Sequence, residues 1–163
     1  MNRIVKVEEA ISLGRKLRSA GKTIVLTGGC FDVIHLGHVK FLEAAKKTGD
    51  ILLVFIESDE NVRRIKGDKR PIHNQDERAQ VLAAIRFVDY VIKIPFFQTN
   101  DGYDKLILRL KPSILAVTKG SSALEHSKRQ AKKVDAKLIE VIGNIPEKST
   151  TKIAQIILDE NKL

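Results

Sequence analysis

Residues 23–57 read TIVLTGGCFDVIHLGHVKFLEAAKKTGDILLVFIE, and the pattern of this stretch decides the fold. Two short, nearly continuous apolar runs, 23–28 and 51–57, are typical of strands that are buried on both faces of a parallel sheet. Between them, residues 36–49 have the composition of a helix that ends at Gly49. A strand, a helix and a second strand in this order predict the βαβ unit of an α/β fold.

The same alternation continues along the rest of the chain. We expect strands at 90–94, 113–118 and 136–142, and helices within 1–21, from about Gln75, at 102–110, from Ser121 and over 149–163. Asn74 followed by Glu77 is a capping-box pattern that marks the start at Gln75, whereas residues 57–74 have the composition of a loop. The chain is therefore predicted to be a doubly wound, Rossmann-like α/β fold, with a parallel sheet, helices on both faces and a single domain over 1–163.

Composition bounds the size of the fold and the kind of partner. A chain of 163 residues with 43% hydrophobic residues is long enough for one well-buried domain. Its 29 Lys and Arg outnumber 20 Asp and Glu, and the net charge of +9 favours anionic partners such as nucleotides or sugar phosphates. The single cysteine, Cys30, excludes an internal disulfide and suits the reducing cytoplasm. Because no apolar run is long enough to span a bilayer, we expect no membrane partner.

The fold class also predicts where a ligand binds. In doubly wound sheets, ligands bind beyond the carboxyl ends of the strands, near the point where the strand order reverses. Four loops are expected to meet there, and they contain the most unusual residues of the chain: 28–35, 57–74, 118–122 and 143–151.

A glycine pair and two histidines follow the first buried strand. Gly28 and Gly29 allow a tight turn and a close approach of the backbone to a ligand. If the next helix begins near His35, then His35 and His38 share its first turn, beside free backbone N–H groups and the positive end of the helix dipole. Gly37 between them leaves room for a nucleotide against this terminus. The pattern favours a phosphate-binding site.

Two other interpretations of these residues stay open. One histidine can cap the helix while the other packs against it, which is the ordinary fate of a lone histidine. A zinc site built from Asp32, His35 and His38 is a third interpretation, but the spacing is not the i, i+4 pair of the zinc proteases. We therefore expect no metal site made of protein ligands alone.

The stretch TGGCFDVIHLGHVKFL at 27–42 resembles the His-x-Gly-His signature of the cytidylyltransferase-like nucleotidyltransferases. The similarity extends through SDENV, KGDKRPI and VDYV, and STTKI at 149–153 is similar to the second signature of that superfamily. Residues 13–32, LGRKLRSAGKTIVLTGGCFD, most resemble the adenylyltransferase domain of heptose 1-phosphate adenylyltransferases. The resemblance covers nearly the whole chain and is weakest over 121–144.

This resemblance implies transfer of AMP from ATP to a phosphorylated small molecule, such as heptose 1-phosphate, with release of pyrophosphate. His35, His38 and Lys66 would be catalytic, and Asp32 and Lys66 would contact the acceptor. The nucleotide would be bound by His35 and His38 together with Gly29, Cys30, Phe31, Gly37, Arg78, Lys119, Gly120, Ser149, Thr150 and Thr151. Mg²⁺ would bridge the phosphates, and a homodimer is expected because relatives are commonly dimeric.

Some of these residues also have an interpretation of their own. Lys66 precedes a glycine, so it lies on a loop that can fold over phosphates. Arg78 is an unusual charge for the first turn of a helix, which indicates that it faces a ligand or an acidic neighbour. The hydroxyls of 149–151 can cap the last helix, bind phosphate, or do both. Cys30 is interpreted as a small loop residue and not as a nucleophile.

Two alternative functions remain. A cytidylyltransferase would use CTP with glycerol 3-phosphate or with choline or ethanolamine phosphate. Such enzymes usually have Arg-Thr-x-Gly-x-Ser before the second signature, whereas this chain has NIPEKSTT at 144–151, which favours ATP. A non-catalytic nucleotide- or RNA-binding module is the alternative from another class. The basic stretch 105–137 keeps it open, although a solvated face is the simpler interpretation and a nucleic acid partner is not expected.

Overall fold

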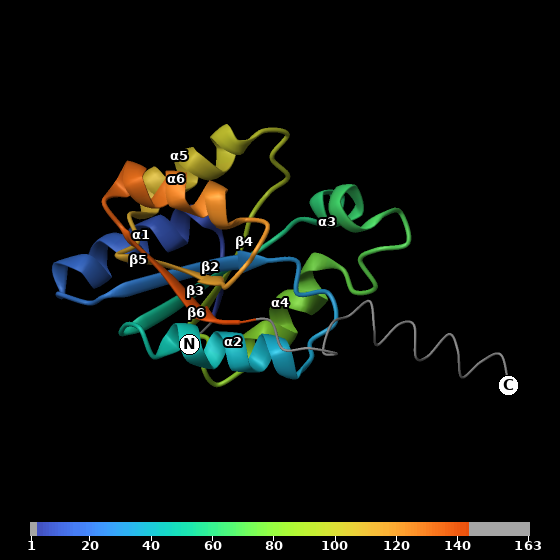
Figure 1. The fold of residues 1–163 in the computed structure, drawn as a ribbon, viewed down its shortest axis with the longest axis horizontal. Coiled ribbons are helices and arrows are strands. Elements are labelled where there is room, and N and C mark those ends of the chain that lie inside the picture. The colour runs from blue at the N-terminus through green and yellow to red at the C-terminus, as the bar shows by residue number, and fades with distance from the viewer. Residues whose placement is uncertain (1–2, 144–163) are drawn as a thin grey trace, which may run out of the picture.

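Six parallel strands form the sheet of the computed structural model, which describes residues 3–143 (Figure 1). The strands are β1 Ile4–Val5, β2 Ile24–Gly29, β3 Ile51–Ile56, β4 Tyr90–Lys93, β5 Ile114–Thr118 and β6 Lys137–Ile142. Their order across the sheet is β1-β4-β3-β2-β5-β6. The strand order therefore reverses at β2, which lies between β3 and β5, and the carboxyl end of β2 marks the expected ligand site.

Helices cover both faces of the sheet. They are α1 Val7–Ser19, α2 Leu36–Lys46, α3 Asp59–Lys66, α4 Gln75–Ala83, α5 Asn100–Leu110 and α6 Leu124–Val134. Figure 1 shows α1, α5 and α6 on one side of the strands and α2 and α4 on the other. The predicted doubly wound architecture is confirmed for the described residues.

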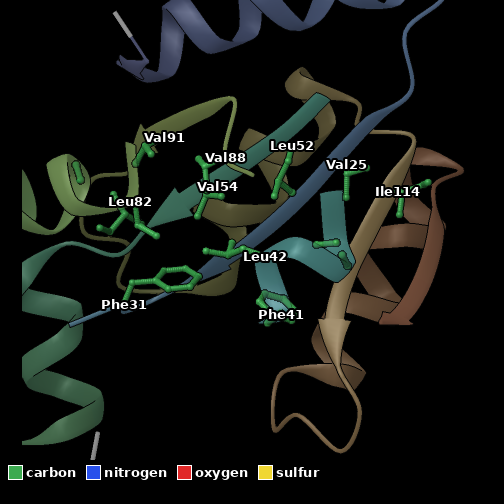
Figure 2. Packing of buried hydrophobic residues seen from close by; sticks show 14 residues of the cluster. Val25, Phe31, Phe41, Leu42, Leu52, Val54, Leu82, Val88, Val91 and Ile114 are labelled. Carbon is green, nitrogen blue, oxygen red and sulfur yellow. The ribbon is translucent and has the colours of Figure 1, made fainter. Parts of the chain in front are cut away.

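The core has two layers because successive strand residues point to opposite faces. Val25 and Val54 pack with Leu42 of α2 and Leu82 of α4 on one face (Figure 2). On the other face, a second cluster joins the sheet to α1, α5 and α6; it includes Ile24, Leu26, Leu53, Ile92, Leu106 and Leu110. Each such buried side chain contributes about 1.5–3 kcal/mol, so the layers hold the loops at the strand ends in place.

Two elements differ from the sequence prediction. The first part of the supposed loop 57–74 is helix α3, which Ser58 caps by accepting a hydrogen bond from the Asn61 backbone N–H. Residues 4–5 form an edge strand that pairs with β4, so the first helix begins at Val7. The predicted C-terminal helix over 149–163 lies outside the described residues.

Candidate active site

A cleft of about 790 Å³ opens at the carboxyl edge of the sheet, around the end of β2. One wall comes from the β2–α2 turn and includes Gly28, Gly29, Cys30, Phe31, His35, Gly37 and His38. A second wall is more polar and includes Glu57, Asn61, Arg64, Tyr103, His126 and Gln130. Thr118, Ser121 and Gly143 also line the cleft. The described parts of all four predicted loop segments therefore meet at this edge.

The turn after β2 is built around the ring of Phe31. Phe31 has a φ of 46°, in the left-handed region, and its side chain is buried. A Cβ on Gly29 would lie 3.1 Å from the Phe31 ring, which is closer than most packed side chains come. The absence of a side chain at Gly29 therefore allows the buried ring to fold back under the turn, and the ring in turn lies 5.2 Å from that of His38.

The two histidines stand at an uncapped helix terminus. His35 is the N-cap residue of α2, but its side chain accepts no capping hydrogen bond, and the first turn has no acidic residue. The rings of His35 and His38 are stacked, with centroids 3.9 Å apart. The Nδ1 atoms of both rings are buried and have no hydrogen-bond partner among residues 3–143. Two unsatisfied ring nitrogens beside free helix N–H groups are the features of an anion-binding site.

Burial controls the charge of this pair. Desolvation lowers the pKa of His35, and it lowers the pKa of His38 to about 4, with a smaller contribution from the neighbouring His35. A backbone hydrogen bond with Val33 acts in the opposite direction on the pKa of His38. Both imidazoles are therefore neutral at pH 7, and a bound polyanion would favour their protonation.

Asp32 orients a loop and does not reach the cleft. Its buried carboxylate forms an ion pair with Arg70 and accepts hydrogen bonds from the backbone N–H groups of Ile72 at 2.8 Å and His73 at 3.2 Å. This carboxylate therefore fastens the segment after α3 to the β2–α2 turn. Asp32 is not among the residues that line the cleft within 3–143, and its contact with the acceptor stays a prediction.

Arg78 is also turned inward, and its guanidinium is 0% exposed. It donates to the carbonyls of Cys30 at 2.5 Å, Glu57 at 2.8 Å and His73 at 2.9 Å, and to Asp59 Oδ1 at 2.6 Å. Sequence analysis left open a ligand or an acidic neighbour, and the structure has the acidic neighbour. Because a buried charge requires such partners, Arg78 holds three loops together, and its predicted contact with a nucleotide stays a prediction.

Three other predicted residues lie at the rim. Lys66 is the exposed last residue of α3, next to Gly67 with its φ of 95°. Lys119 donates its backbone N–H to the Ile142 carbonyl at 2.8 Å, and Gly120 makes the left-handed turn after β5. None of the three is among the cleft-lining residues within 3–143. Ser149, Thr150 and Thr151 lie outside the described residues.

Cys30 lines the cleft without being activated. Burial, the larger effect, and the nearby carboxylate of Glu57 raise the pKa of its thiol, while the cationic side chains of Lys66 and Arg78 act in the opposite direction. The thiol form is therefore favoured, in keeping with a structural role in the cleft wall.

Sequence reasoning did not identify the polar cluster of the second wall. Glu57 Oε2 accepts hydrogen bonds of 2.7 Å from both Asn61 Nδ2 and Tyr103 Oη. Burial raises the pKa of Glu57, and the hydrogen bonds from Tyr103 and Asn61 oppose that shift. The one signal in the sequence was an acid directly after the apolar run ILLVFI. The cluster joins three elements, so no local motif marks it.

His126 also lines the cleft. Its ring meets the Tyr103 ring edge-on at 6.1 Å, and burial lowers its pKa.

Within 3–143, no three His, Cys, Asp or Glu residues gather as a possible metal site. The helices of this part of the chain include none that is long and apolar enough to cross a bilayer.

The fold and the anion-binding turn define a Rossmann-like α/β domain with a nucleotide-type site at the switch in strand order. The chain matches the family described as Cytidylyltransferase-like over residues 26–163, and it belongs to that family. Both the resemblance inferred from the His-x-Gly-His stretch and the fold class are thereby confirmed.

Similar proteins agree with this assignment. The chain is 42% identical over 149 residues to bifunctional protein HldE of Nitratiruptor sp., covering 91% of this chain and 30% of that protein. It is 38% identical over 151 residues to bifunctional protein HldE of Campylobacter fetus, covering 93% of this chain and 30% of that protein. The chain thus spans less than a third of these curated relatives.

Two solved structures are similar in fold. The lipopolysaccharide core biosynthesis protein from Thermoplasma volcanium superposes with a TM-score of 0.62 at 26% identity, covering 77% of this chain and 100% of that one. A pantoate-beta-alanine ligase from Francisella tularensis gives a TM-score of 0.65 at 16% identity, covering 99% of this chain and 77% of that one. The second likeness concerns the fold alone.

Proposed function

We propose that this chain is an adenylyltransferase that moves AMP from ATP to a phosphorylated small molecule, a sugar phosphate such as heptose 1-phosphate, and releases pyrophosphate. The observation that carries the proposal is the uncapped terminus of α2, where the stacked His35 and His38 keep buried Nδ1 atoms without partners among residues 3–143. Family membership and the similarity to HldE proteins support the same reaction class.

In the reaction, a phosphate oxygen of the acceptor attacks the α-phosphorus of ATP. The new P–O bond forms as the bond to the bridging oxygen of the β-phosphate breaks, and pyrophosphate carries away the electron pair. An acceptor phosphate is already anionic near pH 7, so no strong general base is needed. The work of the protein is to align two polyanions and to stabilise charge on the α-phosphoryl oxygens and on the leaving group.

The roles of the residues follow from their places. His35 and His38 donate hydrogen bonds to phosphoryl oxygens, and the backbone of Gly29, Cys30, Phe31 and Gly37 shapes the phosphate path beside them. Lys66 would close over the phosphates as a mobile cation, and its exposed position beside Gly67 supports this role. Lys119 and Gly120 would lie near the base, and Ser149, Thr150 and Thr151 near the triphosphate, as the family resemblance implies.

Magnesium is proposed to enter with the nucleotide, as part of the Mg·ATP substrate. Glu57 is the acid that lines the described part of the cleft, and its Oε2 is already hydrogen-bonded to Tyr103 and Asn61. Phosphate oxygens and water are ligands that Mg²⁺ accepts readily. These residues therefore fit a metal carried by the substrate, and removal of divalent cations should abolish turnover.

The test is a pyrophosphate-release assay of the purified chain with ATP or CTP against a panel of acceptors: sugar 1-phosphates including heptose 1-phosphate, glycerol 3-phosphate, and choline phosphate. We expect turnover with ATP and a sugar phosphate. Faster turnover with CTP would replace the adenylyltransferase assignment by a cytidylyltransferase one. No pyrophosphate from any pair, with nucleotide or RNA still bound, would favour the non-catalytic module.

The homodimer and the cytoplasmic location are proposed on other grounds. The dimer rests on the family resemblance, and the location rests on the single cysteine. Sedimentation at micromolar concentration should give a dimer, and a monomer alone would contradict that part of the proposal.

A further inference from the structure

Helix α3 ends with Lys66, but the apolar core does little to hold this helix. Only Asn61 and Val62 of its 8 residues are buried, and Figure 1 shows α3 beyond the end of the sheet rather than against either face. We propose that Arg64 is a positioning residue, which fixes α3 against the β4–α5 loop and thereby sets the place of Lys66. This inference rests on the proposed nucleotidyl transfer and goes beyond it, because it names the residue on which the action of Lys66 depends.

The side chain of Asn61 is a fixed support for Arg64. It is buried, and its Nδ2 donates to Glu57 Oε2 at 2.7 Å and to Tyr103 Oη at 2.9 Å. Tyr103 Oη in turn donates to Glu57 Oε2 at 2.7 Å. Both protons of the Asn61 amide are therefore used, and its Oδ1 is left as an acceptor for a donor on α3.

The guanidinium of Arg64 is held both along its edge and on its face. Nη2 donates to Asn61 Oδ1 at 2.6 Å, and Nη1 donates to the Gln98 carbonyl at 3.2 Å. The group also lies over the Phe96 ring, with Cζ 5.3 Å from the ring centroid. Phe96 and Gln98 belong to the loop between β4 and α5, so this planar group joins α3 to a residue 34 positions away.

This joint lies next to the end of α3. Arg64 and Ile65 line the cleft, and Lys66 follows them as the exposed last residue of the helix. Within residues 3–143, Arg64 is the last side chain of α3 that bonds to the rest of the protein. Because Gly67 lets the chain turn directly after Lys66, the position of Lys66 is set from the Arg64 side.

A positioning role depends on the shape of the Arg64 side chain, whereas a direct contact with phosphate would depend mainly on its charge. The planar guanidinium can bond to two acceptors and stack on a ring at the same time, but a lysine ammonium is a compact charge on a flexible stem. Arg64→Lys therefore keeps the positive charge and loses the joint. This difference distinguishes the two roles.

The first test compares Arg64→Lys and Arg64→Gln with the parent chain. We expect kcat with ATP and the best sugar phosphate to fall by about 10- to 100-fold in both variants, because a small misplacement of a catalytic group has a cost of this order. ATP affinity in a calorimetric titration should stay within about 3-fold of the parent value, since the anion site at α2 is intact.

Arg63→Gln is the matched control. Arg63 is the exposed neighbour of Arg64 on the same helix, and its side chain has no hydrogen bond or ion pair with another residue of the described part of the chain. Its loss removes the same charge, and turnover should stay within about 2-fold of the parent value. Amide hydrogen exchange over residues 59–67 should rise by at least about 5-fold in both Arg64 variants and stay at the parent rate in Arg63→Gln.

The second test asks whether Arg64 acts through Lys66. In a chain that already has Lys66→Ala, the further change Arg64→Gln should lower kcat by less than about 2-fold, because the group that it positions is gone. Losses that multiply would mean that Arg64 acts on the substrate itself. If the Arg64 variants do not fold, Tyr103→Phe removes the hydroxyl that supports Asn61 and should lower kcat in the same Lys66-dependent way.

The outcomes separate the two proposals. If the parent chain gives no pyrophosphate with any nucleotide and acceptor, the proposed function fails, while hydrogen exchange still shows whether Arg64 fixes α3. If the parent chain is active and Arg64→Lys keeps the parent turnover, the inference about Arg64 is wrong. Equal hydrogen exchange in the Arg63 and Arg64 variants would overturn it as well.

Discussion

Helices α2 and α4 both begin at the carboxyl edge of the sheet, yet their first turns are built in opposite ways. Helix α4 has a complete capping box: Asn74 accepts from the Glu77 N–H at 3.0 Å, and Glu77 accepts from the Asn74 N–H at 2.9 Å. Helix α2 has no side-chain cap and no acid in its first turn, and it has two imidazoles with unpartnered Nδ1 atoms within the described residues.

The difference separates a terminus made for stability from one made for a ligand. At α4 the protein itself supplies the negative charge that a helix dipole favours. At α2 the same electrostatic preference is left unsatisfied, so an external anion can supply it. An uncapped terminus costs stability, and this cost is the basis of the predictions below.

The strongest test gives α2 the cap it lacks. In His35→Asp, a carboxylate at the N-cap would accept backbone N–H groups and stabilise the fold by about 0.5–1 kcal/mol. The same carboxylate would repel phosphate, so ATP affinity should fall at least about 100-fold and turnover about 1,000-fold. Calorimetric titration, steady-state assays and thermal melts measure the three effects. His35→Asn, a neutral cap, should lose less affinity; an Asp variant that binds ATP normally would contradict the anion site.

Removing the other imidazole should have the next largest effect. His38→Ala takes away one preorganised donor, and turnover should fall by roughly 100-fold or more, while nucleotide affinity falls less. Near-normal turnover in a folded variant, as judged by its melting temperature, would show that His38 does not stabilise the transition state.

The pair should also make folding stability sensitive to acid. Because the folded pKa of His38 is about 4, below the usual imidazole value of about 6.5, the unfolded chain binds more protons between these values. The free energy of unfolding should therefore fall as the pH drops from about 6.5 to about 4, by about 2 kcal/mol after allowance for partial exposure. Urea titrations of the parent chain and His38→Gln across this window measure the difference. If the free energy of unfolding fell equally in the parent chain and in His38→Gln across this window, the lowered pKa of His38 would be refuted.

The capped helix provides the smallest effect and the sharpest contrast. Asn74→Ala should destabilise the protein by about 1 kcal/mol, the usual value of a lost N-cap, with turnover unchanged. Denaturant unfolding measures the loss of stability, and the pyrophosphate assay measures turnover. A large loss of turnover here would mean that both helix termini serve the ligand.

Local patterns predicted most of the fold, since the βαβ unit depends on apolar runs and helix caps that lie close together in the chain. Helix α3 was missed because its residues are mostly charged and only Asn61 and Val62 are buried, which leaves little apolar periodicity. Its signals were capping signals: Ser58 before it, acids in the first turn and bases in the last.

The histidine turn was predictable for the same reason, because its residues lie within one loop and one helical turn. The hydrogen bonds of Arg78 and Glu57, in contrast, are made with residues that are remote in sequence. Arg78 Nη1 reaches the Cys30 carbonyl, 48 positions away, and Tyr103 reaches Glu57 across 46 positions. The spacing of residues in the sequence cannot predict whether the guanidinium of Arg78 faces a ligand or three backbone carbonyls.

The buried guanidinium of Arg78 has a kinetic consequence. It holds the carbonyls of Cys30, Glu57 and His73, one from each of three loops around the cleft, so their relative positions are set before any ligand arrives. A preorganised site needs no slow isomerisation before it captures its ligand. In stopped-flow mixing, the observed rate of ATP binding should therefore rise linearly with ATP concentration, without a plateau that would report an opening step.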